Sequence, residues 1–168
     1  YKLAVISNMK LQSLSSCGDI AVSVYSGWLA YSTFDHDWVK QQIETTSVNT
    51  VLEKNWPGLH IEPLQAPENM EVLIGWTGSP ASSPHLVSEV KRLKSDPAFY
   101  GEFLDHSHQC VEYLIHAFKT NNIKGVQKMI RQNRAIIRKM DDQASVDIET
   151  DKLKSLCDIA EKHGGAAK

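Results

Sequence analysis

The chain has 168 residues, of which 42% are hydrophobic and 23% are charged, a length that suits one ordinary domain or one lobe and part of another. Its 18 basic and 20 acidic side chains leave a formal net charge of -2, so no overall field would recruit nucleic acid or an anionic membrane. No apolar run approaches the ~20 residues of a membrane-spanning helix, and the first residues lack the pattern of a signal peptide.

The N-terminal part of the chain predicts short helices around one strand. Leu3 and Ile6 lie at helical spacing in a stretch that continues toward Leu14, and a polar, glycine-containing sequence then ends this helix. Asp19 stands where an N-cap residue is expected, ahead of a short apolar stretch. The further predicted elements are a strand over residues 28–34 and helices over 38–45 and 48–55, the last ended by Pro57 and Gly58.

The remainder predicts two more strands and then helices alone. The strands cover residues 60–65 and 70–77, and the nearly continuous apolar run MEVLIGWT predicts that the second strand is buried. Helices are expected from Ser83, from Asp96–Pro97, after Asn122, and around Leu153 with an end at Gly164–Gly165. Because strands precede helices instead of alternating with them, the pattern predicts an α+β fold, a sheet of few strands with a bundle-like set of about four to six helices.

The first candidate for chemistry is the short sequence SSCGDIA, which begins at Ser15. Small residues let a backbone come close to a ligand, and an acid at the start of the following helix can face the same space. An aspartate at this position is also a common structural N-cap, worth about 1 kcal/mol, and both interpretations stay open at this point.

The second candidate is a hydroxyl-rich loop over residues 75–83, between a predicted buried strand and a predicted helix. Free amides and hydroxyls at the start of a helix suit a phosphate or carboxylate group. Capping of that helix by Ser82 and Ser83 explains the same residues at least equally well.

Histidine and acidic residues do not predict a metal site. The near-neighbour groups are Asp35-His36-Asp37, Asp105 and His106 with Cys110, and His108 with Glu112. None of these groups has the three or four donors at the spacing that zinc requires. Packing and surface roles therefore explain them better.

The helix predicted after Asn122 is strongly basic. Its cationic residues are Lys124, Lys128, Arg131, Arg134, Arg138 and Lys139. A solvated helix face is the favoured interpretation, with the acidic segment over residues 141–151 offsetting the charge, and an anionic partner is the alternative. The three cysteines of the chain are widely spaced and outside any CxxC pattern, which indicates a reducing, cytoplasmic location.

Two strings together resemble a known family. SSCGDIAVSVYSGWLAYSTFDHDW is followed, at the expected distance, by EVLIGWTGSPASSPHLVSEVK. Both resemble segments of the phosphomevalonate kinases, which belong to the GHMP superfamily of small-molecule kinases. The resemblance extends over essentially the whole chain, and two motifs in the same order are more specific than either alone.

The resemblance implies the activity and the substrates. Enzymes of this family transfer the γ-phosphoryl group of ATP, with Mg²⁺, to phosphomevalonate, giving diphosphomevalonate for isoprenoid synthesis. The aspartate of the family motif corresponds to Asp19, the catalytic residue, which is expected to orient the acceptor. The expected substrate-binding residues are Ser16, Gly18, Thr77, Ser79, Ser82 and Ser83.

The resemblance also implies a domain organisation. Residues 1–33 would be a remnant of the N-terminal, nucleotide-side lobe, and residues 34–168 an incomplete C-terminal GHMP kinase domain. The phosphate loop, the catalytic lysine and the C-terminal glycine-rich motif of the family are missing from this sequence. We therefore expect these residues alone to be inactive, with the remainder of the polypeptide as their partner.

Two alternatives stay open. One is another GHMP kinase, such as a mevalonate kinase, although the GWT-serine loop argues against it. The other is a non-catalytic helical interaction module that has kept the fold of a kinase lobe. Nucleic-acid and membrane partners are not expected from the charge or the hydropathy.

Overall fold

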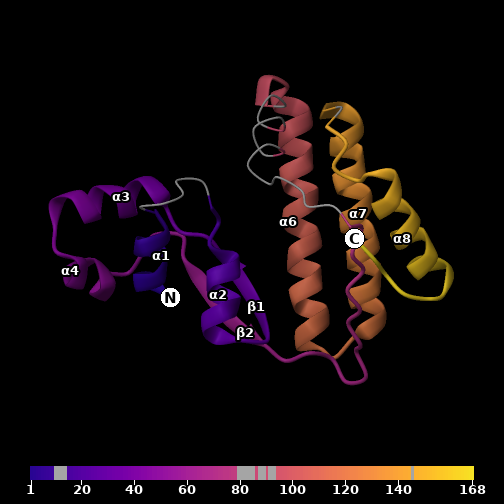
Figure 1. Cartoon of the computed structure of the whole chain (residues 1–168), viewed down its shortest axis with the longest axis horizontal. Helices are drawn as coiled ribbons and strands as arrows, with labels where there is room; N and C mark the ends of the chain where they lie inside the picture. The colour runs from indigo at the N-terminus through magenta and orange to yellow at the C-terminus, as the bar shows by residue number, and fades with distance from the viewer. Residues whose placement is uncertain (10–14, 79–85, 87–89, 91–93, 145) are drawn as a thin grey trace. The chain divides into compact units, whose positions relative to one another are not determined.

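The computed structural model describes residues 1–9, 15–78, 86, 90, 94–144 and 146–168 (Figure 1). The chain forms two compact units, Tyr1–Ala66 and Pro67–Lys168. The predicted α+β class is confirmed, because the described residues form seven helices and one two-stranded antiparallel sheet. The predicted boundary after residue 33 falls inside the first unit, and as a boundary between the lobes of a longer protein it stays a prediction.

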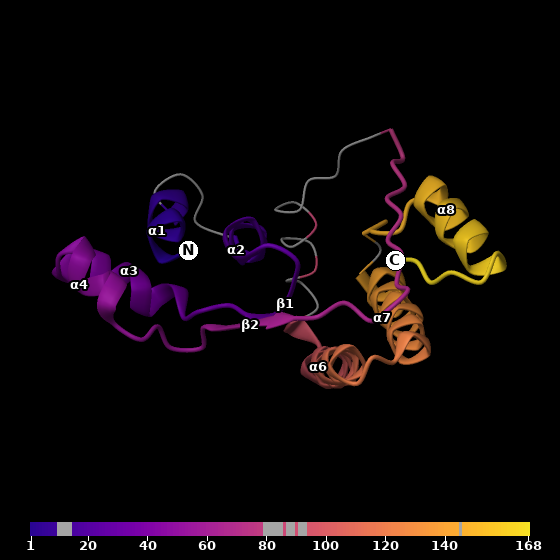
Figure 2. The same ribbon diagram turned by 90° about the horizontal axis from the view of Figure 1, so that it is seen from below.

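The first unit combines a two-stranded antiparallel sheet with four short helices. Its elements are α1 (Lys2–Met9), α2 (Gly18–Tyr25), β1 (Trp28–Ser32), α3 (His36–Thr45), α4 (Val48–Glu53) and β2 (His60–Leu64). The strands β1 and β2 are antiparallel, with Trp28 opposite Leu64 and Ser32 opposite His60. Helix α2 packs against β1, and α3 packs against α4 (Figures 1 and 2). These elements agree with those predicted for this part of the chain.

The core of the first unit is built from side chains that are far apart in the sequence. Its buried members are Val5, Ile6, Cys17, Phe34, Val39, Val51 and Trp56. The indole Nε1 of Trp56 donates a hydrogen bond of 2.9 Å to the carbonyl of Val51, so its polar edge is satisfied inside the core. Helices α1, α3 and α4 and the turn before α2 are thereby held together by burial of apolar surface.

The turn after α4 brings β2 back beside β1. Gly58 has φ +79°, and a Cβ atom at this position would lie 3.1 Å from the carbonyl oxygen of Thr33. The amide of Asp35 donates to the carbonyl of Pro57 at 2.8 Å. Only glycine combines this conformation with so close an approach of two backbones, which explains the predicted stop at Pro57–Gly58.

The second unit contains α6 (Pro97–Lys119), α7 (Ile123–Ala144) and α8 (Asp151–Lys162). The long helices α6 and α7 pack side by side (Figure 1). The carboxylate of Asp96 accepts from the amide of Phe99 at 3.1 Å and caps α6, as the Asp-Pro sequence predicts. At the other end, Gly164 has φ +85°, and the amide of Gly165 donates to the carbonyl of Ala160, which confirms the predicted glycine C-cap of α8.

Helix α8 is joined to α7 by charged contacts around Arg134. The guanidinium is buried, with 6% of the residue exposed. It lies 2.6 Å from Glu149, 2.7 Å from Asp158 and 3.1 Å from Glu161. Burial alone would lower the pKa of Arg134, but the hydrogen bonds from its three carboxylate partners outweigh that effect and raise the pKa.

The predicted offset of the basic helix by the acidic segment is therefore confirmed at Glu149, which also pairs with Arg138 at 3.0 Å. Arg131 donates to the carbonyl of Gly165, and Lys139 pairs with Glu102 on α6 at 2.7 Å. Among the basic residues of α7, Arg134 is buried, whereas Lys124, Lys128, Arg138 and Lys139 are exposed, which agrees with the favoured interpretation of a solvated face.

The predicted buried strand over residues 70–77 is wrong. This segment pairs with no strand among the described residues, and Leu73 and Ile74 are 91% and 93% exposed. The preceding turn is present, with the amide of Met70 donating to the carbonyl of Pro67. An apolar run shows which residues gain from burial, but it does not supply the neighbouring strand that burial and pairing require.

The helix predicted from Ser83 falls largely on residues 79–85, 87–89 and 91–93, which lie outside the described part of the chain. Within the described ranges, no helix combines the length and the apolar character needed to cross a bilayer.

Candidate functional site

The candidate site is the turn that leads from Ser15 into α2. Cys17 occupies the N-cap position with φ +58° and ψ +21°, in the left-handed region, and makes no side-chain cap. Asp19 is therefore not the N-cap residue that the sequence predicts, and it lies instead in the first turn of the helix. The prediction was wrong because the N-cap lies two residues earlier, at Cys17, whose buried side chain packs into the core of the first unit.

The carboxylate of Asp19 faces solvent. The residue is exposed, and its Oδ1 accepts one hydrogen bond, of 2.9 Å, from the amide of Ile20. Lone pairs on both carboxylate oxygens remain available, because a carboxylate accepts about four hydrogen bonds in all. Amides in the first turn of a helix have no intrahelical acceptor, so this end of α2 carries partial positive charge beside the carboxylate.

The carbonyl of Ser16 is held by two hydroxyl groups from the strand side of the unit. Tyr31 donates to it at 2.5 Å and Thr33 donates to it at 3.1 Å. The same peptide is fixed at its other end, where the amide of Cys17 donates to Oγ of Ser15 at 3.1 Å. The orientation of the Ser16–Cys17 peptide is thus determined on both sides, two residues before Asp19.

Sequence reasoning missed the roles of Tyr31 and Thr33. The available signal was the period of two in an extended segment, which places residues 31 and 33 on one face. Two hydroxyl side chains on one face next to a small-residue turn indicate hydrogen bonds to backbone.

Cys17 links the turn to the core. It is 1% exposed, and burial raises the pKa of its thiol, although hydrogen bonds with Ser15 and Asn8 act in the opposite direction. A left-handed conformation costs a residue with a side chain about 1–2 kcal/mol, which the burial of the side chain offsets.

The other predicted substrate-binding residues belong to the first and second units separately. Gly18 begins α2, and a Cβ atom at this position would meet the ring of Tyr31 at 3.6 Å. Thr77 lies in the second unit, where it lines a cavity of about 370 Å³ with Trp76 and residues of α8. Ser79, Ser82 and Ser83 lie outside the described residues.

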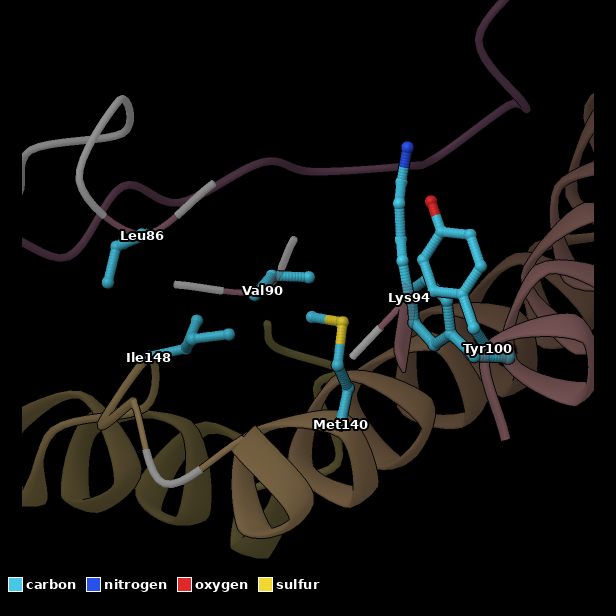
Figure 3. Close-up of a pocket in the computed structure, with 7 residues that line it drawn as sticks. Leu86, Val90, Lys94, Tyr100, Met140 and Ile148 are labelled. Carbon is cyan, nitrogen blue, oxygen red and sulfur yellow. The ribbon is translucent and has the colours of Figure 1, made fainter. Parts of the chain in front are cut away.

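A second cavity of the second unit is almost entirely apolar. It has a volume of about 330 Å³ and is lined by Leu86, Val90, Lys94, Tyr100, Phe103, Met140 and Ile148 (Figure 3). The ammonium of Lys94 lies 5.7 Å from the centre of the Tyr100 ring. None of the residues predicted for the site lines this cavity, whose surface suits an apolar group and not a phosphate.

A third cavity, of about 430 Å³, is acidic. Its lining includes Asp141, Asp142, Asp147, Glu149 and Asp151 together with Arg138 and Lys154. One buried oxygen, Oδ1 of Asp141, has no hydrogen-bond partner among the described residues. In the described ranges, no group of three or more histidine, cysteine or acidic side chains has the arrangement of a metal site.

The Asp35-His36-Asp37 group also has structural roles. Asp35 accepts from the amide of Trp38 at 3.0 Å and caps α3. The ring of His36 stacks on Phe34 with centroids 4.3 Å apart, and its Nε2 lies 3.3 Å from Oγ1 of Thr33.

The comparisons with known proteins confirm the resemblance. A curated phosphomevalonate kinase from Streptomyces sp. (strain CL190) is 34% identical over 169 residues, which cover 100% of this chain and 45% of that enzyme. No family model matches the chain.

Two solved structures have a similar fold. A Lin0012 protein from Listeria innocua superposes with a TM-score of 0.89 at 39% identity, over 98% of this chain and 46% of that one. A Streptococcus pneumoniae phosphomevalonate kinase in complex with phosphomevalonate and AMPPNP superposes with a TM-score of 0.67 at 27% identity, over 88% of this chain and 42% of that one. The chain thus resembles phosphomevalonate kinases along its whole length and spans less than half the length of each relative.

Proposed function

We propose that these residues form part of an enzyme that transfers the γ-phosphoryl group of ATP to phosphomevalonate, giving diphosphomevalonate. The observation that carries this proposal is the 34% identity to the Streptomyces phosphomevalonate kinase, which extends over the entire chain. The exposed carboxylate of Asp19, at the start of α2 and beside a fixed turn, supports the proposal. A cytoplasmic location would keep the three free cysteines reduced.

The proposed role of Asp19 follows from the chemistry of the acceptor. A phosphate monoester has a second pKa of about 6, so at neutral pH the attacking oxygen is mostly deprotonated already. A strong general base would therefore contribute little. Phosphoryl transfer depends chiefly on the positions of the reacting groups and on stabilisation of charge, and Asp19 would orient the acceptor and the cations that accompany it.

The surroundings of Asp19 suit this role. A carboxylate and a dianionic acceptor repel each other, so a cation or a helix dipole has to lie close to both. The N-terminus of α2 provides partial positive charge next to the carboxylate. The exposed Ser16 and the side-chain-free Gly18 leave this end of the helix open to an anionic group.

The donor set at Asp19 fits a Mg²⁺ ion that arrives with the nucleotide. Mg²⁺ in phosphoryl-transfer sites is bound through one or two carboxylates together with substrate phosphates and water, so a single exposed carboxylate is an adequate contribution from these residues. When bound, Mg²⁺ would neutralise charge on the phosphates. Asp19 would hold it, and the Ser15–Gly18 turn would keep Asp19 in place.

Acceptor contacts are proposed for Ser16, Gly18 and Thr77, with Ser79, Ser82 and Ser83 as further candidates from the motif. The complex of the S. pneumoniae relative with phosphomevalonate and AMPPNP supports a small-molecule acceptor and an adenine nucleotide donor. The remaining parts of the active site, including a phosphate loop, would come from the rest of the polypeptide.

The test uses the natural gene product that contains these residues, called the full-length protein below. Purified protein is supplied with ATP and Mg²⁺, and ADP release is measured with phosphomevalonate, mevalonate or diphosphomevalonate as the acceptor. Release with phosphomevalonate alone is the expected result. Release with mevalonate would identify another GHMP kinase, and no release with any acceptor would favour the non-catalytic interaction module.

A further inference from the structure

Two hydrogen-bonded chains of side chains end on one backbone carbonyl in the first unit. The carbonyl of Ser16 accepts from Tyr31 and from Thr33. Behind them, the hydroxyl of Tyr1 lies 2.8 Å from that of Tyr31, and Nε2 of His36 lies 3.3 Å from Oγ1 of Thr33. Four side chains are therefore connected to a single peptide: Tyr31 lies in β1, His36 lies in α3, Tyr1 directly precedes α1 and Thr33 directly follows β1.

The direction of each chain follows from proton counting. A hydroxyl group carries one proton, and Tyr31 and Thr33 each use theirs on the Ser16 carbonyl. Tyr1 must then be the donor to Tyr31, and Nε2 of His36 must carry the proton that it donates to Thr33. The burial of Tyr1, followed by its hydrogen bond with Tyr31, raises the pKa of Tyr1 and keeps this phenol protonated.

The carbonyl of Ser16 lies just before the start of α2, which carries Asp19. Cys17 follows it in a left-handed conformation, and α2 begins at Gly18 with Asp19 as its second residue. A rotation of the Ser16–Cys17 peptide would change the direction in which α2 leaves the turn, and with it the position of the Asp19 carboxylate. Both donors lie on the open side of the turn, since Thr33 is exposed and Tyr31 is half-buried.

We propose that Tyr31 and Thr33 are positioning residues for Asp19, acting through their shared hydrogen bonds to the Ser16 carbonyl. This inference rests on the proposed phosphoryl-transfer function of Asp19. Neither hydroxyl touches the reacting atoms, and their effect is to fix the peptide that sets the start of α2. Misplacement of a reacting group by about 1 Å can reduce a rate by about 100-fold, so hydrogen bonds of modest strength can have large effects on turnover.

The test compares isosteric variants of the full-length protein. Tyr31→Phe and Thr33→Val each remove one hydroxyl, and we expect each to lower kcat by about 5-fold and the pair to lower it by about 30-fold, with the KM for ATP changed by less than about twofold. Thr33→Ser retains the hydroxyl and should restore most of kcat. Thr45→Val and Tyr113→Phe are matched controls, because Thr45 donates only within α3 and Tyr113 is an exposed residue of α6.

The same substitutions in an Asp19→Asn background separate positioning from general damage. If the hydroxyls act through Asp19, the double variant should lower kcat by less than about twofold in that background, because the effects are then not additive. Two results would overturn the positioning role and leave the proposed function intact. The first is full additivity of the effects on kcat. The second is a wild-type kcat in the Tyr31→Phe/Thr33→Val protein together with a lowered kcat in Asp19→Asn. Wild-type kcat in Asp19→Asn would instead overturn the function assigned to Asp19, and the positioning role with it.

Discussion

Arg134 and Asp19 are both charged side chains of helices, but they differ in what surrounds the charge. Arg134 is buried in the second unit and is in contact with three carboxylates, from Glu149, Asp158 and Glu161. Asp19, in the first unit, is exposed and accepts one hydrogen bond, from the next amide of its own helix. A charge whose partners all come from the chain holds elements together, whereas a charge with unused hydrogen-bonding capacity at the surface is available to a ligand.

The strongest test of the structural side of this comparison is Arg134→Ala. Its removal leaves the largely buried Glu149 with Arg138 as a cationic partner and takes the guanidinium away from Asp158 and Glu161, so the free energy of unfolding should fall by about 3 kcal/mol. Urea unfolding followed by the loss of helical circular dichroism measures this change. Lys128→Ala, an exposed basic residue of the same helix, is the matched control and should change stability by less than about 0.5 kcal/mol. An equally large fall in the unfolding free energy of the control would show that stability depends on the overall charge of α7 and not on the buried cluster.

A pair of identical substitutions distinguishes the apolar core from the exposed apolar segment. Val126 of α7 is 3% exposed, and its replacement by Ala should cost about 2 kcal/mol. Val72 is 59% exposed in the segment for which the sequence predicts a buried strand, and the same replacement should change the stability of the 168-residue chain by less than about 0.5 kcal/mol. Equal losses of unfolding free energy in the two variants, measured by urea titration, would show that the segment over residues 70–77 is buried after all.

The smallest expected effect concerns the three buried thiols. Burial raises the pKa of Cys17, Cys110 and Cys157. The folded chain therefore keeps protons that the unfolded chain releases above the ordinary thiol pKa of about 8.5, so this contribution to stability is present below that pH and is lost as the pH rises above it. The free energy of unfolding, measured by urea titration at several pH values, should decline gradually above pH of about 8.5. Alkylation of all three thiols in the folded chain as fast as in urea would contradict the burial.

Local signals in the sequence predicted most of the elements. Apolar spacing predicted α1, α6, α7 and α8, and Asp96 and Gly164 predicted where two of these helices begin and end, because capping depends on residues close in the sequence. The strand over residues 70–77 was wrong, because pairing depends on a partner that a local pattern does not contain.

The sequence indicated which residues belong to the candidate site but not how they are arranged. The motif indicated Asp19 as the catalytic residue, which stays a prediction, and the structure leaves its side chain exposed. Its position in the first turn, and not at the cap, follows from the burial of Cys17 against side chains of α1 and α3, which is a tertiary effect. The hydroxyls of Tyr31 and Thr33 reach the Ser16 carbonyl across 15 and 17 residues of sequence, a distance over which no local pattern applies.

The most direct test of the functional side of the comparison is the steady-state kinetics of Asp19→Asn in the full-length protein, with phosphomevalonate as the acceptor. Because the side chain is exposed, its replacement should change the free energy of unfolding by less than about 0.5 kcal/mol. The predicted result is a fall in kcat of about 100-fold or more, with KM for phosphomevalonate within about threefold of the wild-type value. A raised KM with unchanged kcat, or wild-type kinetics, would contradict the assignment of Asp19 to phosphoryl transfer.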